Sequence, residues 1–171
     1  MTPASRRELR GFVSGFREKA WEKYWEGARS LVARERVQLL GHLPHDLLRH
    51  LYPCVDLGVF PSVLPEAGPL VYLETLASGC PALGTRVGGM AGWARAVSKR
   101  LPRGIAWPAL DPNPGKIIQG LVKQIPRALE LGRRHRAVLR QFAVEAHDWR
   151  KIAAIWMEAL RQISMPSRGI I

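Results

Sequence analysis

The stretch PSVLPEAGPLVYLETLASGCPALGTRVGG, residues 61–89, decides the fold of this chain. It opens with a loop rich in proline and glycine, continues as a helical pattern from Pro69 to Ser78, and then reaches a short apolar run at 80–84. Another apolar run, 56–60, precedes it. A strand, a helix and a second strand in this order are typical of a parallel α/β unit, and continuous apolar runs indicate strands buried on both faces.

The same alternation continues on either side of this stretch. Short apolar runs recur along the chain, separated by helical patterns, at 37–40, 56–60, 80–84 and 104–107. The sequence therefore predicts an α/β fold, a Rossmann-like parallel sheet of about four strands flanked by helices. After Asp111 the pattern is helical in three segments, 114–132, 133–146 and 147–162, and a kink is expected at Pro126.

The first part of the chain has a different pattern. Residues 1–36 lack strand patterning and place apolar side chains at helical spacing between charges, at Phe16, Ala20, Tyr24, Ala28 and Leu31. We therefore divide the chain into an N-terminal amphipathic helical segment (1–36), a Rossmann-like core (37–110) and C-terminal helices (111–171) that pack on the same domain.

Length and hydropathy exclude several classes of protein. With 171 residues and 47% hydrophobic residues, the chain is long and apolar enough to bury a core without disulfide or metal support. The longest stretch without a charged side chain, residues 75–85, is shorter than the roughly 18 to 20 apolar residues of a membrane span. No apolar signal segment follows the basic N-terminus. We therefore expect a cytoplasmic protein.

The charge is unusual, because 26 Lys and Arg residues stand against 14 Asp and Glu residues, a net charge of +12. Such a surface attracts phosphates, anionic lipid and nucleic acid without selecting among them. The basic stretch RRHRAVLR (133–140) is either a solvated helix face or a peripheral contact with anionic lipid headgroups. No nucleic-acid-binding module is visible, so nucleic acid is not expected as a partner.

Cysteine and histidine contribute little to the functional assignment. Cys54 and Cys80 lie in apolar surroundings without a C-x-x-C pattern, so each is predicted to be a small buried side chain. His42, His45 and Asp46 form a small cluster without a fourth ligand nearby, and we expect no metal site.

Two carboxylates flank the loop of the deciding stretch. Glu66 is predicted to follow a strand at its carboxyl end, Pro69 to occupy the first position of a helix, and Glu74 to lie about one turn inside it. A helix start offers N–H groups and a positive dipole end, which suits a phosphate. Because carboxylates repel phosphates, Glu66 and Glu74 are better acceptors for sugar hydroxyls on either side of it, the layout of a nucleotide sugar. The alternatives are a solvated turn or helix cap for Glu66, and a buried ion pair with an arginine for Glu74.

These residues resemble a known family. The spacing Glu66-x7-Glu74 is preceded by Pro61-Ser62 and followed by Ala77-x-Gly79-x-Pro81 and by Gly88-Gly89. The pattern resembles the C-terminal, donor-binding half of the GT-B glycosyltransferases of family 4, the retaining group 1 enzymes. The resemblance extends from about Val37 into the last helical segment, HDWRKIAAIWMEAL, which is similar to their closing helix.

The resemblance implies roles for the matched residues. Glu66 would bind the donor sugar near its reaction centre, as the catalytic residue, and Glu74 would hold the ribose hydroxyls. Four consecutive residues would approach the sugar and diphosphate with their backbone: Ala67, Gly68, Pro69 and Leu70. Gly41 and His42 would border the base, and Gly88 and Gly89 would line the sugar side. The donor would be a UDP-, GDP- or ADP-linked sugar, bound without a metal or other cofactor.

Three hypotheses follow for the function. The chain is a donor-binding half that needs an acceptor domain, from a separate chain, for retaining glycosyl transfer. Alternatively, it is a truncated, inactive glycosyltransferase fragment, or a basic non-enzymatic module that binds membranes or nucleic acid. An uncovered sheet edge on the N-terminal side of the core predicts pairing with a partner chain or self-association.

Overall fold

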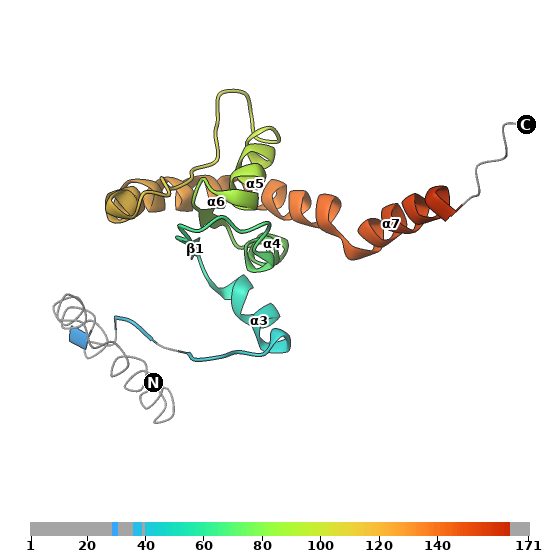
Figure 1. Ribbon diagram of the computed structural model, residues 1–171. Coiled ribbons are helices and arrows are strands. Elements are labelled where there is room, and N and C mark those ends of the chain that lie inside the picture. Colours follow the sequence, from blue (N-terminus) through green and yellow to red (C-terminus); the bar gives the residue numbers. More distant parts are fainter. Residues whose placement is uncertain (1–28, 31–35, 39, 165–171) are drawn as a thin grey trace, which may run out of the picture. The chain divides into compact units, whose positions relative to one another are not determined.

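A computed structural model describes residues 29–30, 36–38 and 40–164 of the chain (Figure 1). Contacts divide the chain into two units, residues 1–48 and 49–171, and each is described by itself because their relative positions are not determined. The predicted domain limits at residues 36 and 110 stay predictions. The apolar positions of the predicted N-terminal helix, from Phe16 to Leu31, lie outside the described residues.

A small parallel sheet forms the centre of the second unit. Strand β1 (Gly58–Phe60) pairs in parallel with β2 (Ala82–Gly84), with Val59 opposite Leu83, and a single parallel bridge joins Thr85 to Leu110. The α/β fold class and the helical C-terminus are confirmed. The expected number of about four strands is wrong, because the described sheet has two.

The run at 104–107 forms no strand because its backbone groups bond elsewhere. The Ile105 N–H donates to the Pro102 carbonyl, and the Trp107 N–H donates to the Ser98 hydroxyl at 2.9 Å. The chain reaches the sheet only at Leu110, whose N–H donates to the Gly84 carbonyl. The other predicted outer strand, 37–40, is also absent at the three of its residues that the structure describes.

Helices precede, connect and follow the two strands along the chain. A short helix, α3 (His45–Leu51), and a 3₁₀ turn, η1 (Tyr52–Cys54), precede β1. Helix α4 (Leu70–Ala77) connects the two strands, and α5 (Gly88–Ser98) follows β2. A second 3₁₀ turn, η2 (Pro114–Lys116), leads into the long helix α6 (Ile117–His147), and α7 (Trp149–Ser164) ends the described chain.

Helix α6 bends at a different residue from the one expected. Its backbone leaves the helical region at His135 (φ −122°, ψ 21°), whereas Pro126 lies inside a helical stretch. Pro126 frees the carbonyl of Val122, which is exposed and can bond to water, so the proline is tolerated there. The break falls close to Gly132. A side chain at this position would overlap the Pro81 ring, so the glycine allows α6 to approach the residue before β2 closely.

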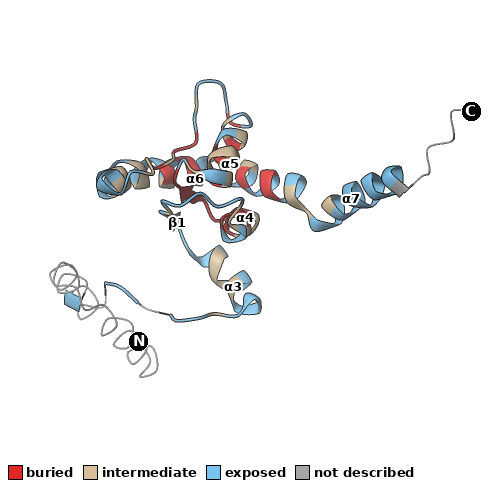
Figure 2. Cartoon of the chain, in the orientation of Figure 1, coloured by how far each residue is buried: buried red, intermediate tan, exposed pale blue. Residues whose placement is uncertain are grey.

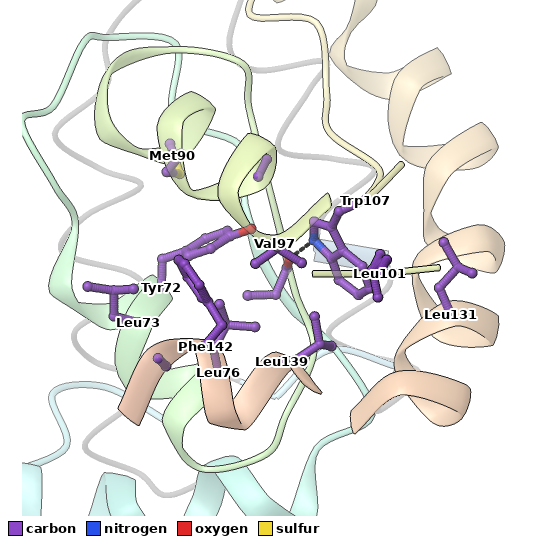
Figure 3. Packing of buried hydrophobic residues seen from close by; sticks show 13 residues of the cluster. Tyr72, Leu73, Leu76, Met90, Val97, Leu101, Trp107, Leu131, Leu139 and Phe142 are labelled. Atoms are coloured by element: carbon purple, nitrogen blue, oxygen red, sulfur yellow. Dashed lines mark hydrogen bonds between the residues drawn. The ribbon is translucent and has the colours of Figure 1, made fainter. Parts of the chain in front are cut away.

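The core lies between α4, α5, α6 and the sheet. Figure 3 shows Tyr72, Val97, Trp107 and Leu139 gathered in one cluster of buried side chains. The Trp107 indole N–H donates to the Ala82 carbonyl at 2.9 Å, which satisfies its polar atom inside the core. Complete burial of a leucine such as Leu139 stabilises the fold by about 1.5–3 kcal/mol.

Helix α7 differs from α4, α5 and α6 in its exposure. Figure 2 shows α7 almost entirely in the colour of exposed residues. Trp149, Ile155 and Trp156 are each about two-thirds exposed, at 68%, 68% and 66%. Packing against the rest of the second unit therefore contributes little to the stability of this helix.

Candidate functional site

The loop between β1 and α4 lies at the carboxyl edge of the parallel strands. β1 ends at Phe60 and β2 at Gly84, and the next residue, Thr85, donates its hydroxyl to the Ser62 carbonyl. The carboxyl edge is where open α/β sheets bind their ligands. The deciding stretch of sequence therefore has its loop in the position that a ligand site requires.

Glu66 is exposed in this loop and is held at two points. Its side-chain oxygen Oε1 accepts a hydrogen bond from the Ser62 hydroxyl at 2.8 Å. Its backbone carbonyl accepts a hydrogen bond from the Gly89 N–H at 2.9 Å. The second bond joins the loop to the first turn of α5.

Gly88 and Gly89 make this close approach possible. A Cβ on Gly88 would overlap the backbone of Glu66, and Gly88 also has a positive φ of 52°. A Cβ on Gly89 would overlap the Ala67 carbonyl oxygen and lie 2.9 Å from the Gly68 Cα. The predicted site residues of the loop and of the Gly-Gly pair are therefore brought together, with backbone packed on backbone.

The start of α4 differs by one position from the prediction. Pro69 is the N-cap residue of α4 (φ −68°, ψ 105°), and Leu70, which is exposed, is the first helical residue. The expectation that Pro69 begins the helix is wrong because its extended ψ places it outside. The Tyr72 N–H donates to the Pro69 carbonyl at 3.0 Å. The amides of Leu70 and Val71, which have no acceptor within a helix, are those that a ligand at this end would meet.

Glu74 is the fifth residue of α4, and its neighbours differ from those of Glu66. Its side chain is half-buried, and its Oε2 atom is buried. Burial raises the pKa of Tyr52, and the negative charge of Glu74 raises that pKa further. Glu74 thus lies near the 3₁₀ turn before β1, whereas Glu66 faces Ser62.

Gly41 and His42 belong to the first unit, where both are exposed. Because the two units are not placed relative to each other, the predicted contact of these residues with a base stays a prediction.

An aromatic series lies beneath the loop. Tyr72 stacks on Trp93 with ring centroids 5.7 Å apart, and His147 meets the edge of Trp93 at 5.7 Å and that of Phe142 at 5.4 Å. Burial lowers the pKa of His147. A Cβ on Gly68 would lie 3.0 Å from the Trp93 ring, so the loop rests directly on this series.

The sequence assigned no role to Ser62, in this loop, or to Thr85, directly after β2. Both are small hydroxyl residues that follow predicted strands. This position at the carboxyl ends of the strands is the feature of the sequence that could have marked them as site residues. Thr85 donates to the Ser62 carbonyl, 23 positions away, and Ser62 donates to Glu66, 4 positions away. Only the folded chain reveals these partners.

Other charged and sulfur-containing side chains have structural partners or lie exposed. In the stretch 133–140, Arg136 donates to the carbonyls of Gly79 and Pro53, and Arg134 pairs with Glu130 at 2.8 Å. Lipid contact by this stretch stays a prediction.

Cys80 is buried as predicted, and burial raises the pKa of its thiol. Cys54 is exposed, so the prediction for it is wrong. It lies in η1 at the surface of the unit, where its thiol donates to the His50 carbonyl at 3.3 Å.

Neither a metal cluster nor a membrane helix occurs in the described part of the chain. Residues 29–30, 36–38 and 40–164 contain no group of three His, Cys, Asp or Glu side chains that could hold a metal ion. In the same ranges, no helix is long and apolar enough to cross a bilayer.

Comparisons with known proteins support the fold and identify the family. In structure, the chain is similar to sucrose-phosphate synthase from Thermosynechococcus elongatus, with a TM-score of 0.62 and 22% sequence identity. The match covers 84% of this chain and 34% of the synthase, so the chain spans about a third of that protein's length and shares its fold. No curated protein sequence matches the chain. The sequence model described as "Glycosyl transferases group 1" matches residues 4–112, which include the loop and the Gly-Gly pair. The chain therefore belongs to the group 1 glycosyl transferases.

Proposed function

We propose that the chain is the donor-binding half of a retaining glycosyltransferase and binds a nucleoside diphosphate sugar at the loop 66–70. The observation that supports this most is the backbone contact of Glu66 and Ala67 with Gly88 and Gly89. This contact brings the starts of α4 and α5 together at the carboxyl edge of the sheet. Two helix starts at one edge supply N–H groups and positive dipole ends for a diphosphate.

The two carboxylates take the hydroxyl groups of the donor. Glu66 is exposed beside the loop amides and would accept hydrogen bonds from the sugar near the bond that is transferred. Glu74, further along α4, would accept from the ribose hydroxyls. In this arrangement the phosphates meet the helix starts and neither carboxylate. The helix dipoles would stabilise the diphosphate as it leaves.

The acceptor would bind to a second wall of the site. The chain spans about a third of the synthase that it resembles in structure. We propose that the acceptor-binding part comes from a further polypeptide segment, in the same or in a separate chain. The donor half alone would then bind its nucleotide sugar without efficient transfer.

Calorimetric titration tests the donor site. We would titrate the wild-type chain with UDP, GDP and ADP, and then repeat the titrations with Glu74→Gln. One nucleotide should bind in preference to the other two, and Glu74→Gln should weaken its binding about tenfold, as expected for lost hydrogen bonds to a charged group. Glu158→Gln is the matched control, because Glu158 is exposed on α7 and pairs with Arg161.

Two results would contradict the proposal. Binding of no nucleotide at all would point to an inactive fragment that keeps the fold. Equal binding of all three nucleotides that weakens steeply with salt and ignores Glu74→Gln would point to a nonspecific basic surface.

A further inference from the structure

We propose that Ser62 is a positioning residue that orients the Glu66 carboxylate toward the donor sugar. This inference rests on the proposed function, because it concerns how the donor-binding loop holds its exposed carboxylate. Ser62 itself would not touch the donor.

Two acceptors compete for the Ser62 hydroxyl. The Ser62 hydroxyl has one proton, and two oxygens lie within reach: Glu66 Oε1 at 2.8 Å and the Leu64 carbonyl at 3.4 Å. A short bond to a carboxylate is stronger than a long bond to a neutral carbonyl. The proton therefore goes to Glu66.

Ser62 is itself fixed in place. Its carbonyl accepts a hydrogen bond from the hydroxyl of Thr85, a fully buried residue that directly follows β2. Thr85 also forms the parallel bridge with Leu110. The Ser62 backbone is thus tied to the rigid sheet, although Ser62 lies in a loop.

The backbone of Glu66 is held as well. The Gly89 N–H donates to the Glu66 carbonyl at 2.9 Å. With the backbone held by α5 and Oε1 held by Ser62, the rotation of the carboxylate is restricted. Its other oxygen, Oε2, is then presented to a donor hydroxyl in one orientation, which lowers the entropy lost on binding.

Titrations with the nucleotide sugar and with the free nucleoside diphosphate test this role. Because Glu66 would contact the sugar, Ser62→Ala should weaken binding of the nucleotide sugar about three- to tenfold and leave that of the free nucleotide unchanged. Ser62→Thr keeps the hydroxyl and should restore affinity. Ser78→Ala, at the C-cap of α4, is the matched control and should have no effect.

A double-mutant cycle separates positioning from a direct contact. If Ser62 acts through Glu66, Ser62→Ala should cause no further loss of affinity in a chain that already carries Glu66→Ala. Additive losses would overturn the inference, because Ser62 would then contribute independently of Glu66.

A readout without ligand keeps this inference distinct from the proposed function. The relaxation of the Glu66 side-chain carboxyl carbon, measured by NMR on the free chain, should show greater mobility in Ser62→Ala than in the wild type. Unchanged mobility would overturn the positioning role even if the donor binds. If the wild type binds no nucleotide sugar, the proposed function is wrong, and the NMR comparison still decides whether Ser62 orients Glu66.

Discussion

At Gly89 the start of α5 lies so close to the loop before α4 that no side chain fits between them. Three residues along the same helix, a Cβ on Gly92 would meet no atom within 4 Å. The two glycines thus differ in role. Gly89 permits a close backbone contact, whereas Gly92 only adds flexibility to the helix.

Substitution of each glycine by alanine should change stability in opposite directions. Gly89→Ala should destabilise the fold by about 1–3 kcal/mol, because the methyl group would force the loop away from α5. Gly92→Ala should stabilise it by about 0.5–1 kcal/mol, because alanine loses less backbone entropy in a helix. Urea denaturation of the two variants measures the difference. A shift of both in the same direction would contradict the packing at Gly89.

His147 should make stability depend on pH in a defined window. Burial among Trp93 and Phe142 lowers its pKa in the folded state, so the unfolded chain binds a proton more readily. The stabilising contribution is therefore complete above the unfolded pKa of about 6.5 and is lost as the pH falls through the lower, folded pKa.

Thermal unfolding between about pH 7.5 and pH 5 measures this contribution. The wild type should lose stability over this range, and His147→Phe should lose less. The carboxyls of Asp111 and Glu145 also have lowered pKa values, mainly through the Asn113 N–H and the Gln141 side chain, respectively, but they titrate below this window. An equal loss in both chains would show that His147 is not responsible.

At the scale of elements, α6 and α7 contribute very differently to the fold. Helix α6 buries Leu139 and Phe142 in the main core, and the Arg100 guanidinium lies over the Phe142 ring at 5.4 Å. Among the residues of α7 whose side chains are described, none is buried.

Aromatic truncation on each helix checks this contrast. Phe142→Ala should cost about 3–5 kcal/mol through lost contacts and a cavity. Trp156→Ala should change stability by no more than about 0.5 kcal/mol, because Trp156 is 66% exposed. The free energy of unfolding from urea titration measures both. A large loss for Trp156→Ala would mean that α7 is covered in solution.

Element boundaries could be predicted only where the signal is local. The predicted divisions after residues 132 and 146 lie within three residues of the break at His135 and of the start of α7 at Trp149. The strand expected at 104–107 is wrong because an apolar run does not reveal which acceptor each N–H will find. The Pro102 carbonyl accepts the hydrogen bond from the Ile105 N–H, and the Ser98 hydroxyl accepts that from the Trp107 N–H.

At the scale of the whole molecule, donor binding and transfer should be separable. Transfer requires the acceptor to be held against the donor with water excluded, and orientation of two reactants can supply about 7–11 kcal/mol of the barrier reduction. The chain alone should therefore show turnover far below the range of about 1–10³ s⁻¹ that is usual for enzymes. A labelled-sugar transfer assay with the nucleotide sugar that binds best measures this. Efficient turnover by the purified chain would contradict the need for a second wall.

The order of strand, loop, helix and strand, the group 1 family and the Gly-Gly pair as part of its motif followed from the sequence by itself. These features depend on short-range patterns, namely apolar runs, turn residues and the fixed spacing from Glu66 to Glu74. The tertiary structure alone decided that Ser62 holds Glu66, that Gly89 binds its carbonyl, and that Pro69 caps α4. It also decided that the sheet is so short. Each of these outcomes depends on backbone conformation and on distances between groups that only the folded chain brings together.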